Sequence, residues 1–74
     1  MQEDKFKVRA FGYGELAQLY FPNIAKHSAT IQLSRWIRLN EKLQVELKAS
    51  GHKPWQKLLT PKQVELIINA IGEP

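Results

Sequence analysis

The sequence predicts a mainly α-helical single domain that contains a small two-stranded β element. Apolar residues recur every three or four positions through most of the chain, short segments with glycine or proline separate these stretches, and strict alternation occurs only near the start. A chain of 74 residues forms one domain with little margin in its core, because it buries only about 60% of the surface that its unfolded form exposes. With no cysteine, its stability must come from packing rather than disulfides.

The first element is a strand over Lys5–Phe11, in which Phe6, Val8 and Ala10 alternate with basic residues. Period two over this length is typical of a half-buried strand with a solvated face. Residues 1–4 are expected to be disordered.

A turn at 12–14 leads into a short helix that begins at Glu15, where a carboxylate meets the positive end of the helix dipole. Phe21-Pro22 ends this helix, because the residue before a proline is pushed out of helical geometry. A connector follows, and Ser28 is a suitable N-cap for the next helix.

The helix over Ser28–Asn40 is amphipathic when its residues are placed at about 100° per position. One face gathers the apolar residues Ala29, Leu33, Trp36 and Ile37. The opposite face gathers Ile31, Ser34, Arg35 and Arg38. The helical pattern then continues over Glu41–Ser50 and stops at Gly51. Residues 29–50 could form one helix or two; we favour two, with a break at Asn40.

The last helix has the clearest boundaries. Thr60 caps it, Pro61 takes its first position, and Gln63 completes a capping box with Thr60. Its apolar stripe consists of Val64, Ile67, Ile68 and Ile71, and Gly72 ends it. Before it, Trp55–Leu59 could form a second short strand and pair with the first, because an isolated strand would not be stable alone.

Positive charge is concentrated in the middle of the chain. Residues 26–62 contain eight basic residues against two acidic ones, a balance of +6 in a chain whose total is +4. Such a concentration on a helix and the loop after it suits a polyanion, of which duplex DNA is the commonest.

The helices at 15–20 and 28–40 have the order of a helix-turn-helix, with 21–27 as a turn longer than usual. The second helix would present polar side chains to base edges in the major groove, where arginine suits guanine. The candidate DNA-binding residues on and before this helix are Lys26, His27, Ser28, Thr30, Ser34, Arg35 and Arg38. The alternative is an ordinary amphipathic surface helix with solvated arginines.

The segment His52–Lys57 is a candidate wing, in which Lys53 and Lys57 would contact phosphates. The alternative is a solvated turn with Trp55 packed on the core, which is the better interpretation for the indole itself. Ile31 and Leu66 fall outside the apolar stripes of their helices. They indicate either a dimer contact or a core that wraps around more than one helix face.

Nothing in the sequence indicates catalysis or the binding of a metal or cofactor. His27 and His52 are far apart, with no cysteine and few carboxylates near them, so no metal site is expected. The 12–14 segment lacks the lysine and the spacing of a phosphate-cradling loop, and no cofactor motif is present. No catalytic arrangement can be argued, so we expect no enzyme. Without an apolar run for export or for a membrane span, a cytoplasmic protein is expected.

The sequence resembles a small bacterial domain-of-unknown-function family from gut anaerobes. The segments that carry this resemblance extend over nearly the whole chain: 11–17 (FGYGELA), 20–22 (YFP), 33–37 (LSRWI), 58–64 (LLTPKQV) and 71–74 (IGEP). This resemblance implies no activity.

A looser resemblance is to MerR-type winged-helix regulators and phage excisionases. It rests on a strand leading into Gly-Glu-Leu-Ala, a later Arg-Trp pair, and a Gly-His-Lys loop before Leu-Thr-Pro-Lys-Gln-Val. It implies that Arg35 and Arg38 lie on a recognition helix, Lys53 and Lys57 in a wing, and 60–63 at the next helix start. The long dimerising helix of MerR-type regulators has no counterpart before Pro74, so the resemblance does not imply dimeric operator recognition and is compatible with monomeric or accessory DNA binding.

The sequence therefore predicts a winged helix-turn-helix-like domain that binds double-stranded DNA, as an accessory regulator of transcription or recombination. The rival is a small protein-protein interaction module, or weak homodimer, in which Ile31, Leu66 and the aromatic residues form a docking face. No membrane partner is expected.

Overall fold

The structure is a computed structural model that describes residues 6–53 and 56–74. Three sequence-based expectations lie outside these ranges: the disorder of residues 1–4, the Lys5 end of the first strand, and the placement of Pro54 and Trp55.

The described chain forms four helices and one antiparallel two-stranded sheet, as the sequence predicts. In chain order the elements are β1 (Phe11–Gly12), α1 (Tyr13–Tyr20), α2 (Lys26–Arg38), α3 (Glu41–Ala49), β2 (Leu58–Leu59) and α4 (Pro61–Ile71).

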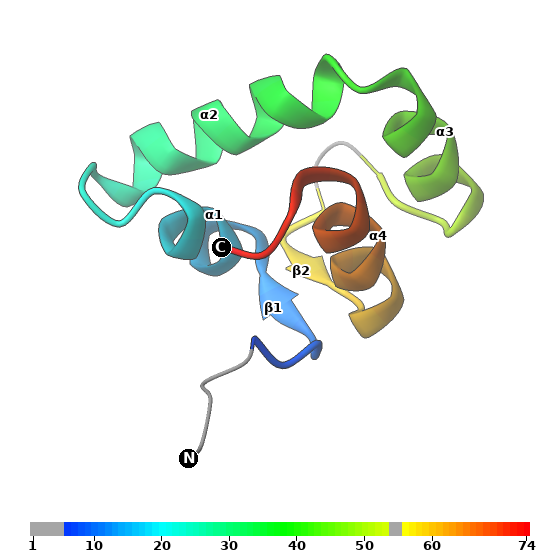
Figure 1. Ribbon diagram of the computed structural model, residues 1–74, viewed down its shortest axis with the longest axis horizontal. Coiled ribbons are helices and arrows are strands. Elements are labelled where there is room, and N and C mark those ends of the chain that lie inside the picture. The colour runs from blue at the N-terminus through cyan, green and yellow to red at the C-terminus, as the bar shows by residue number, and fades with distance from the viewer. Residues whose placement is uncertain (1–5, 54–55) are drawn as a thin grey trace.

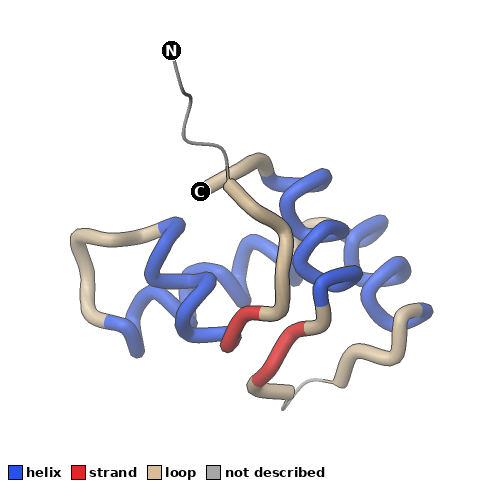
Figure 2. The backbone as a smooth tube through the Cα atoms, turned by 90° about the horizontal axis from the view of Figure 1, so that it is seen from below, coloured by secondary structure: helices blue, strands red, loops and turns tan. Residues whose placement is uncertain are grey.

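The longest helix, α2, lies along one edge of the domain, with α1 beneath its first half and α3 at its far end (Figure 1). The sheet joins the start of α1 to the start of α4, because Phe11 pairs with Leu59 and Gly12 with Leu58 (Figure 2). The core lies between the helices and takes residues from all of them. Its buried apolar members are Phe11, Leu16, Ala17, Ala29, Leu33, Ile37, Leu43, Leu47, Leu59, Val64 and Ile67.

The predicted strand over Lys5–Phe11 is wrong for most of its length. Among its described residues, 6–11, only Phe11 lies in β1, and Val8 is exposed. Phe6 instead stacks on Phe11 with ring centroids 5.3 Å apart. The partner strand explains the short pairing: β2 is two residues long and runs directly into the cap of α4, so the segment before Phe11 has no further ladder to join.

The first helix begins two residues earlier than expected. Tyr13 and Gly14 are helical rather than part of a turn, and Gly12 is the N-cap. The Glu15 carboxylate accepts a hydrogen bond from the Gly12 N–H at 3.1 Å, which satisfies a backbone donor at the helix start. The predicted end of the helix at Phe21 is confirmed.

Helix α2 begins at Lys26, so the prediction of Ser28 as its N-cap is wrong. The N-cap is Ala25, whose carbonyl accepts a hydrogen bond from the Ala29 N–H at 2.8 Å. Ala29 and Leu33 are fully buried, so packing rather than a capping side chain fixes where this helix starts. The connector from α1 is consequently five residues long, 21–25.

The break at Asn40 is confirmed, and the region forms two helices. The Asn40 side chain accepts a hydrogen bond from the Leu43 N–H at 3.0 Å and caps α3. Gln44 donates to the carbonyls of Ile37 and Arg38, which are among the last acceptors of α2. The side chains of Asn40 and Gln44 therefore bond three backbone groups at the break, one N–H and two carbonyls.

Helix α3 ends in a Schellman motif. The His52 N–H donates to the Leu47 carbonyl and the Gly51 N–H to the Lys48 carbonyl, each at 3.0 Å. Gly51 has φ of +93°, in the left-handed region that favours glycine. The stop that the sequence predicts at Gly51 is confirmed.

Replacing Gly51 with alanine is expected to lower the free energy of unfolding by about 1 kcal/mol, because a side chain disfavours this φ. A Cβ at this position would contact nothing within 4 Å, so the cost is purely conformational. Urea unfolding followed by circular dichroism measures the change. An unchanged or raised midpoint would contradict the assigned backbone geometry.

Helix α4 has the boundaries that the sequence predicts. Thr60 accepts from the Gln63 N–H at 3.2 Å, and the Gln63 side chain accepts from the Thr60 N–H at 3.0 Å. Ile68 and Ile71 are half-buried beside the core. Leu66 also packs against the core, which favours the wrapped core for this residue rather than a dimer contact. Ile31 on α2 is 48% exposed.

Candidate nucleic-acid interface

Four of the candidate DNA-binding residues form a row along one flank of α2. Lys26, Thr30, Ser34 and Arg38 succeed one another at every fourth position, which places them one above the other on a helix. This flank borders the buried stripe of α2 and faces the start of α1 and the loop before β2, as the pockets beside it show.

Two open pockets follow this flank. The first has a volume of about 650 Å³ and is bounded by the start of α1, by Lys26, Thr30 and Ser34 of α2, and by Gln56 and Lys57. The second, of about 570 Å³, continues toward the end of α2, where Arg38 and Lys48 line it. Tyr13 and Ser34 line both pockets and lie at the boundary between them.

A hydrogen bond between two hydroxyls joins the residues at this boundary. Tyr13 Oη and Ser34 Oγ lie 2.9 Å apart, and either can be the donor. Burial raises the pKa of Tyr13 above its ordinary value, so the phenol keeps its proton at neutral pH. The bond joins the first residue of α1 to the middle of α2.

The hydroxyls of Thr30 and Ser34 are thus engaged within the domain. Thr30 Oγ1 donates to the Lys26 carbonyl at 2.9 Å, and Ser34 is bonded to Tyr13. Both residues lie beside the basic ones on this flank, and the hydrogen bonds of their hydroxyls are made to groups of the domain itself.

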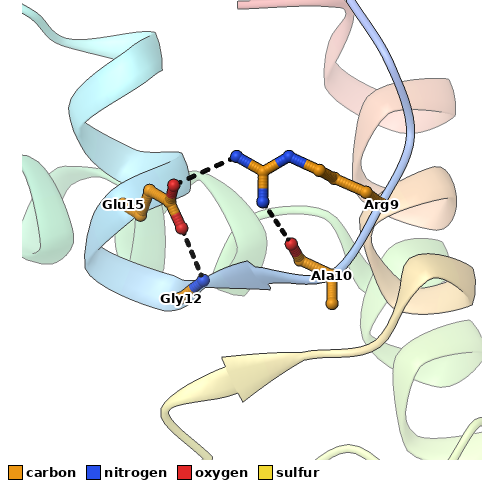
Figure 3. Close-up of polar contacts among 4 residues, drawn as sticks. All are labelled: Arg9, Ala10, Gly12 and Glu15. Carbon is orange, nitrogen blue, oxygen red and sulfur yellow. Dashed lines mark hydrogen bonds and ion pairs between the residues drawn. The ribbon is translucent and has the colours of Figure 1, made fainter.

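The single carboxylate among the described residues that line the first pocket is already paired. Glu15 Oε2 accepts a hydrogen bond from Arg9 at 3.1 Å while Oε1 accepts from the Gly12 N–H (Figure 3). The Gly12 hydrogen bond, followed by that of Arg9, lowers the pKa of Glu15. Arg9 is fixed in turn by the Ala10 carbonyl at 2.7 Å and by the Phe11 ring, 3.7 Å below its guanidinium carbon.

Of the five remaining candidates, four lie outside the two pockets. His27, Ser28 and Arg35 are exposed on α2, on the same open side of the helix as Ile31. Lys53 is exposed in the loop between α3 and β2. Lys57 lines the first pocket, and its carbonyl accepts a hydrogen bond from the Tyr13 N–H at 2.7 Å, which ties this loop to the start of α1.

Several residues of this surface were not among the sequence candidates: Tyr13, Gln44, Lys48, His52 and Gln56. Tyr13 meets Ser34 across 21 positions, and no local pattern announces such a contact. His52 borders the second pocket, where burial lowers the pKa of its imidazole and so favours the neutral form.

Within 6–53 and 56–74, no group of three histidine, aspartate or glutamate side chains is placed to hold a metal ion. In the same ranges, no helix has the length and hydropathy that crossing a bilayer would need.

Fold and surface together define a small, mainly helical domain whose second helix is packed on one side and carries basic residues beside open pockets. Residues 7–74 match the family described as Domain of unknown function (DUF4248), and the chain belongs to this family. No curated protein and no solved structure matches the chain.

Proposed function

We propose that this domain binds duplex DNA, with α1 and α2 as a helix-turn-helix and α2 in the major groove. The observation that carries the proposal is the arrangement along α2: one side of this helix is packed in the core, while Arg35 and Arg38 are exposed and Lys26 and Arg38 border open pockets. A recognition helix needs this combination of a buried face and a free polar face.

The connection between the two helices also supports the proposal. Only five residues separate α1 from α2, fewer than the 21–27 turn that the sequence indicates and closer to the three or four of a helix-turn-helix. Lys57 comes to the same side of the domain as α2, where a wing would contact the DNA backbone. The looser resemblance to MerR-type regulators and excisionases has the same order of parts.

Binding of this kind depends strongly on salt. Each phosphate that a lysine or arginine neutralises contributes about −0.9 to the slope of log affinity against log salt. Fluorescence anisotropy of a labelled mixed-sequence duplex, measured from about 50 mM to about 200 mM salt, should give affinity that falls steeply across this range. Absence of binding by micromolar protein at the lowest salt would overturn the proposal.

The rival function is docking of a protein partner. It is favoured by the exposure of apolar residues on and after α2, namely Ile31 at 48% and Leu39 at 77%. It predicts association that is insensitive to salt and to the arginines but is lost on Ile31→Ser. Analytical ultracentrifugation of the wild type and of this variant would detect a weak homodimer.

A further inference from the structure

We infer that the first pocket is the seat of one backbone phosphate of the bound duplex, and that Lys26 is the residue that holds this phosphate. The inference rests on the proposed function and goes beyond it by assigning a defined site, with its ligand chemistry, at the junction of α1, α2 and the segment before β2.

The position of Lys26 depends on a glycine of the neighbouring helix. A Cβ built on Gly14 would lie 2.7 Å from Cε of Lys26 and 3.4 Å from its Cγ, so the lysine side chain crosses the place that any other residue would fill. Gly14 has no positive φ that would require glycine for backbone reasons. The absence of a side chain at position 14 therefore leaves room for the lysine beside the pocket.

The electrostatics of the pocket favour an anion. Lys26 and Lys57 both line it, and the one carboxylate among its described lining residues, Glu15, is bonded to Arg9. The charge of Arg9 offsets that of Glu15, so the two lysines remain as net positive charge at an open surface. A phosphodiester, with one negative charge and exposed oxygens, is complementary to such a site.

The hydroxyl pair at the edge of the pocket supplies a further donor. Tyr13 and Ser34 each carry one hydroxyl proton, and their mutual hydrogen bond uses one of the two. The other proton is free to point toward a phosphate oxygen. This hydrogen bond would add direction to the charge attraction of the lysines.

A double-mutant cycle tests the seat. Lys26→Ala should weaken duplex binding about tenfold at about 50 mM salt and reduce the salt slope by about 0.9. Gly14→Ala changes no charge, and alanine is the better helix former, so this variant should fold at least as well while its methyl group displaces Lys26. It should weaken binding severalfold, and Lys26→Ala should then have a smaller effect in its background than in the wild type.

Lys62→Ala is the matched control, since Lys62 is an exposed lysine in the first turn of α4 and lines neither of the two pockets. Effects of the two substitutions that simply add, or a Lys26→Ala effect no larger than that of Lys62→Ala, would overturn the seat. If binding persists in those variants but is lost in an Arg35→Ala, Arg38→Ala double variant, the seat fails and the proposed function stands. If the wild type does not bind duplex at all, both fail.

Discussion

Replacing Arg35 and Arg38 together with alanine is expected to weaken duplex binding by about a hundredfold at about 50 mM salt, because each lost phosphate or base contact of a cation removes about a factor of ten there. Both guanidinium groups are exposed on α2, and neither forms an ion pair with the described residues. Exposed charges contribute little to stability, so the Tm should move by only a degree or two. Anisotropy and thermal unfolding of the same preparations measure both quantities.

The control for this prediction removes the same charge elsewhere. Lys42→Ala combined with Lys62→Ala changes two exposed lysines, one on α3 and one on α4. A loss of affinity in this control equal to that of the arginine variant would mean that overall charge, and not the surface of α2, binds the duplex.

Replacing Gln63 with alanine is expected to lower the free energy of unfolding by about 3 kcal/mol, because it leaves buried polar groups without partners and creates a cavity. Gln63 is the one polar residue in the core of the described chain and is 2% exposed. Its Oε1 accepts from the Thr60 N–H at 3.0 Å and from Gln56 Nε2 at 2.6 Å, and its Nε2 donates to Ser50 Oγ at 3.3 Å. This side chain therefore ties α4 to both ends of the loop between α3 and β2.

Thr60→Ala provides the comparison, since it removes the other half of the same capping box. The loss of this cap should cost about 1 kcal/mol. Urea unfolding of the two variants separates a capping role from a bridging role. If Gln63→Ala costs no more than Thr60→Ala, the hydrogen bonds to Gln56 and Ser50 contribute nothing to stability.

Local signals in the sequence are sufficient to predict a helix boundary wherever the residue at that boundary has a strong backbone preference. The break at Asn40, the stop at Gly51 and the start of α4 at Pro61 are all where the sequence predicts them. The start of α2 depends on packing that local signals do not carry. Burial of Ala29 and Leu33 starts α2 at Lys26, ahead of the better capping residue Ser28.

The strand near the start was overpredicted for a related reason. Alternation is a property of one segment, whereas the length of a strand also depends on its partner, and β2 is only two residues long. For Trp36 on α2, too, the pattern of one segment does not determine how deeply the side chain is buried. Its ring packs edge-on against Phe21 with ring centroids 4.8 Å apart, and the residue remains 38% exposed beside the apolar stripe.

The sequence indicates which residues of α2 belong to the candidate site, but not the contacts that shape the pockets beside them. The row of Lys26, Thr30, Ser34 and Arg38 follows from helical spacing once the helix is known to begin at Lys26. The contacts that shape the pockets join residues far apart in the chain, such as Tyr13 with Ser34, and periodicity carries no information about them.

The central claim is that α2 and the pocket flank beside it form a duplex-binding surface, and NMR tests it most directly. Titration of the ¹⁵N-labelled domain with an unlabelled duplex at low salt should shift the amide signals of residues 26–38 and 12–15, and leave those of the outer face of α3, around Val45, nearly unchanged. Shifts confined to other surfaces, or no shifts with excess duplex, would contradict the claim.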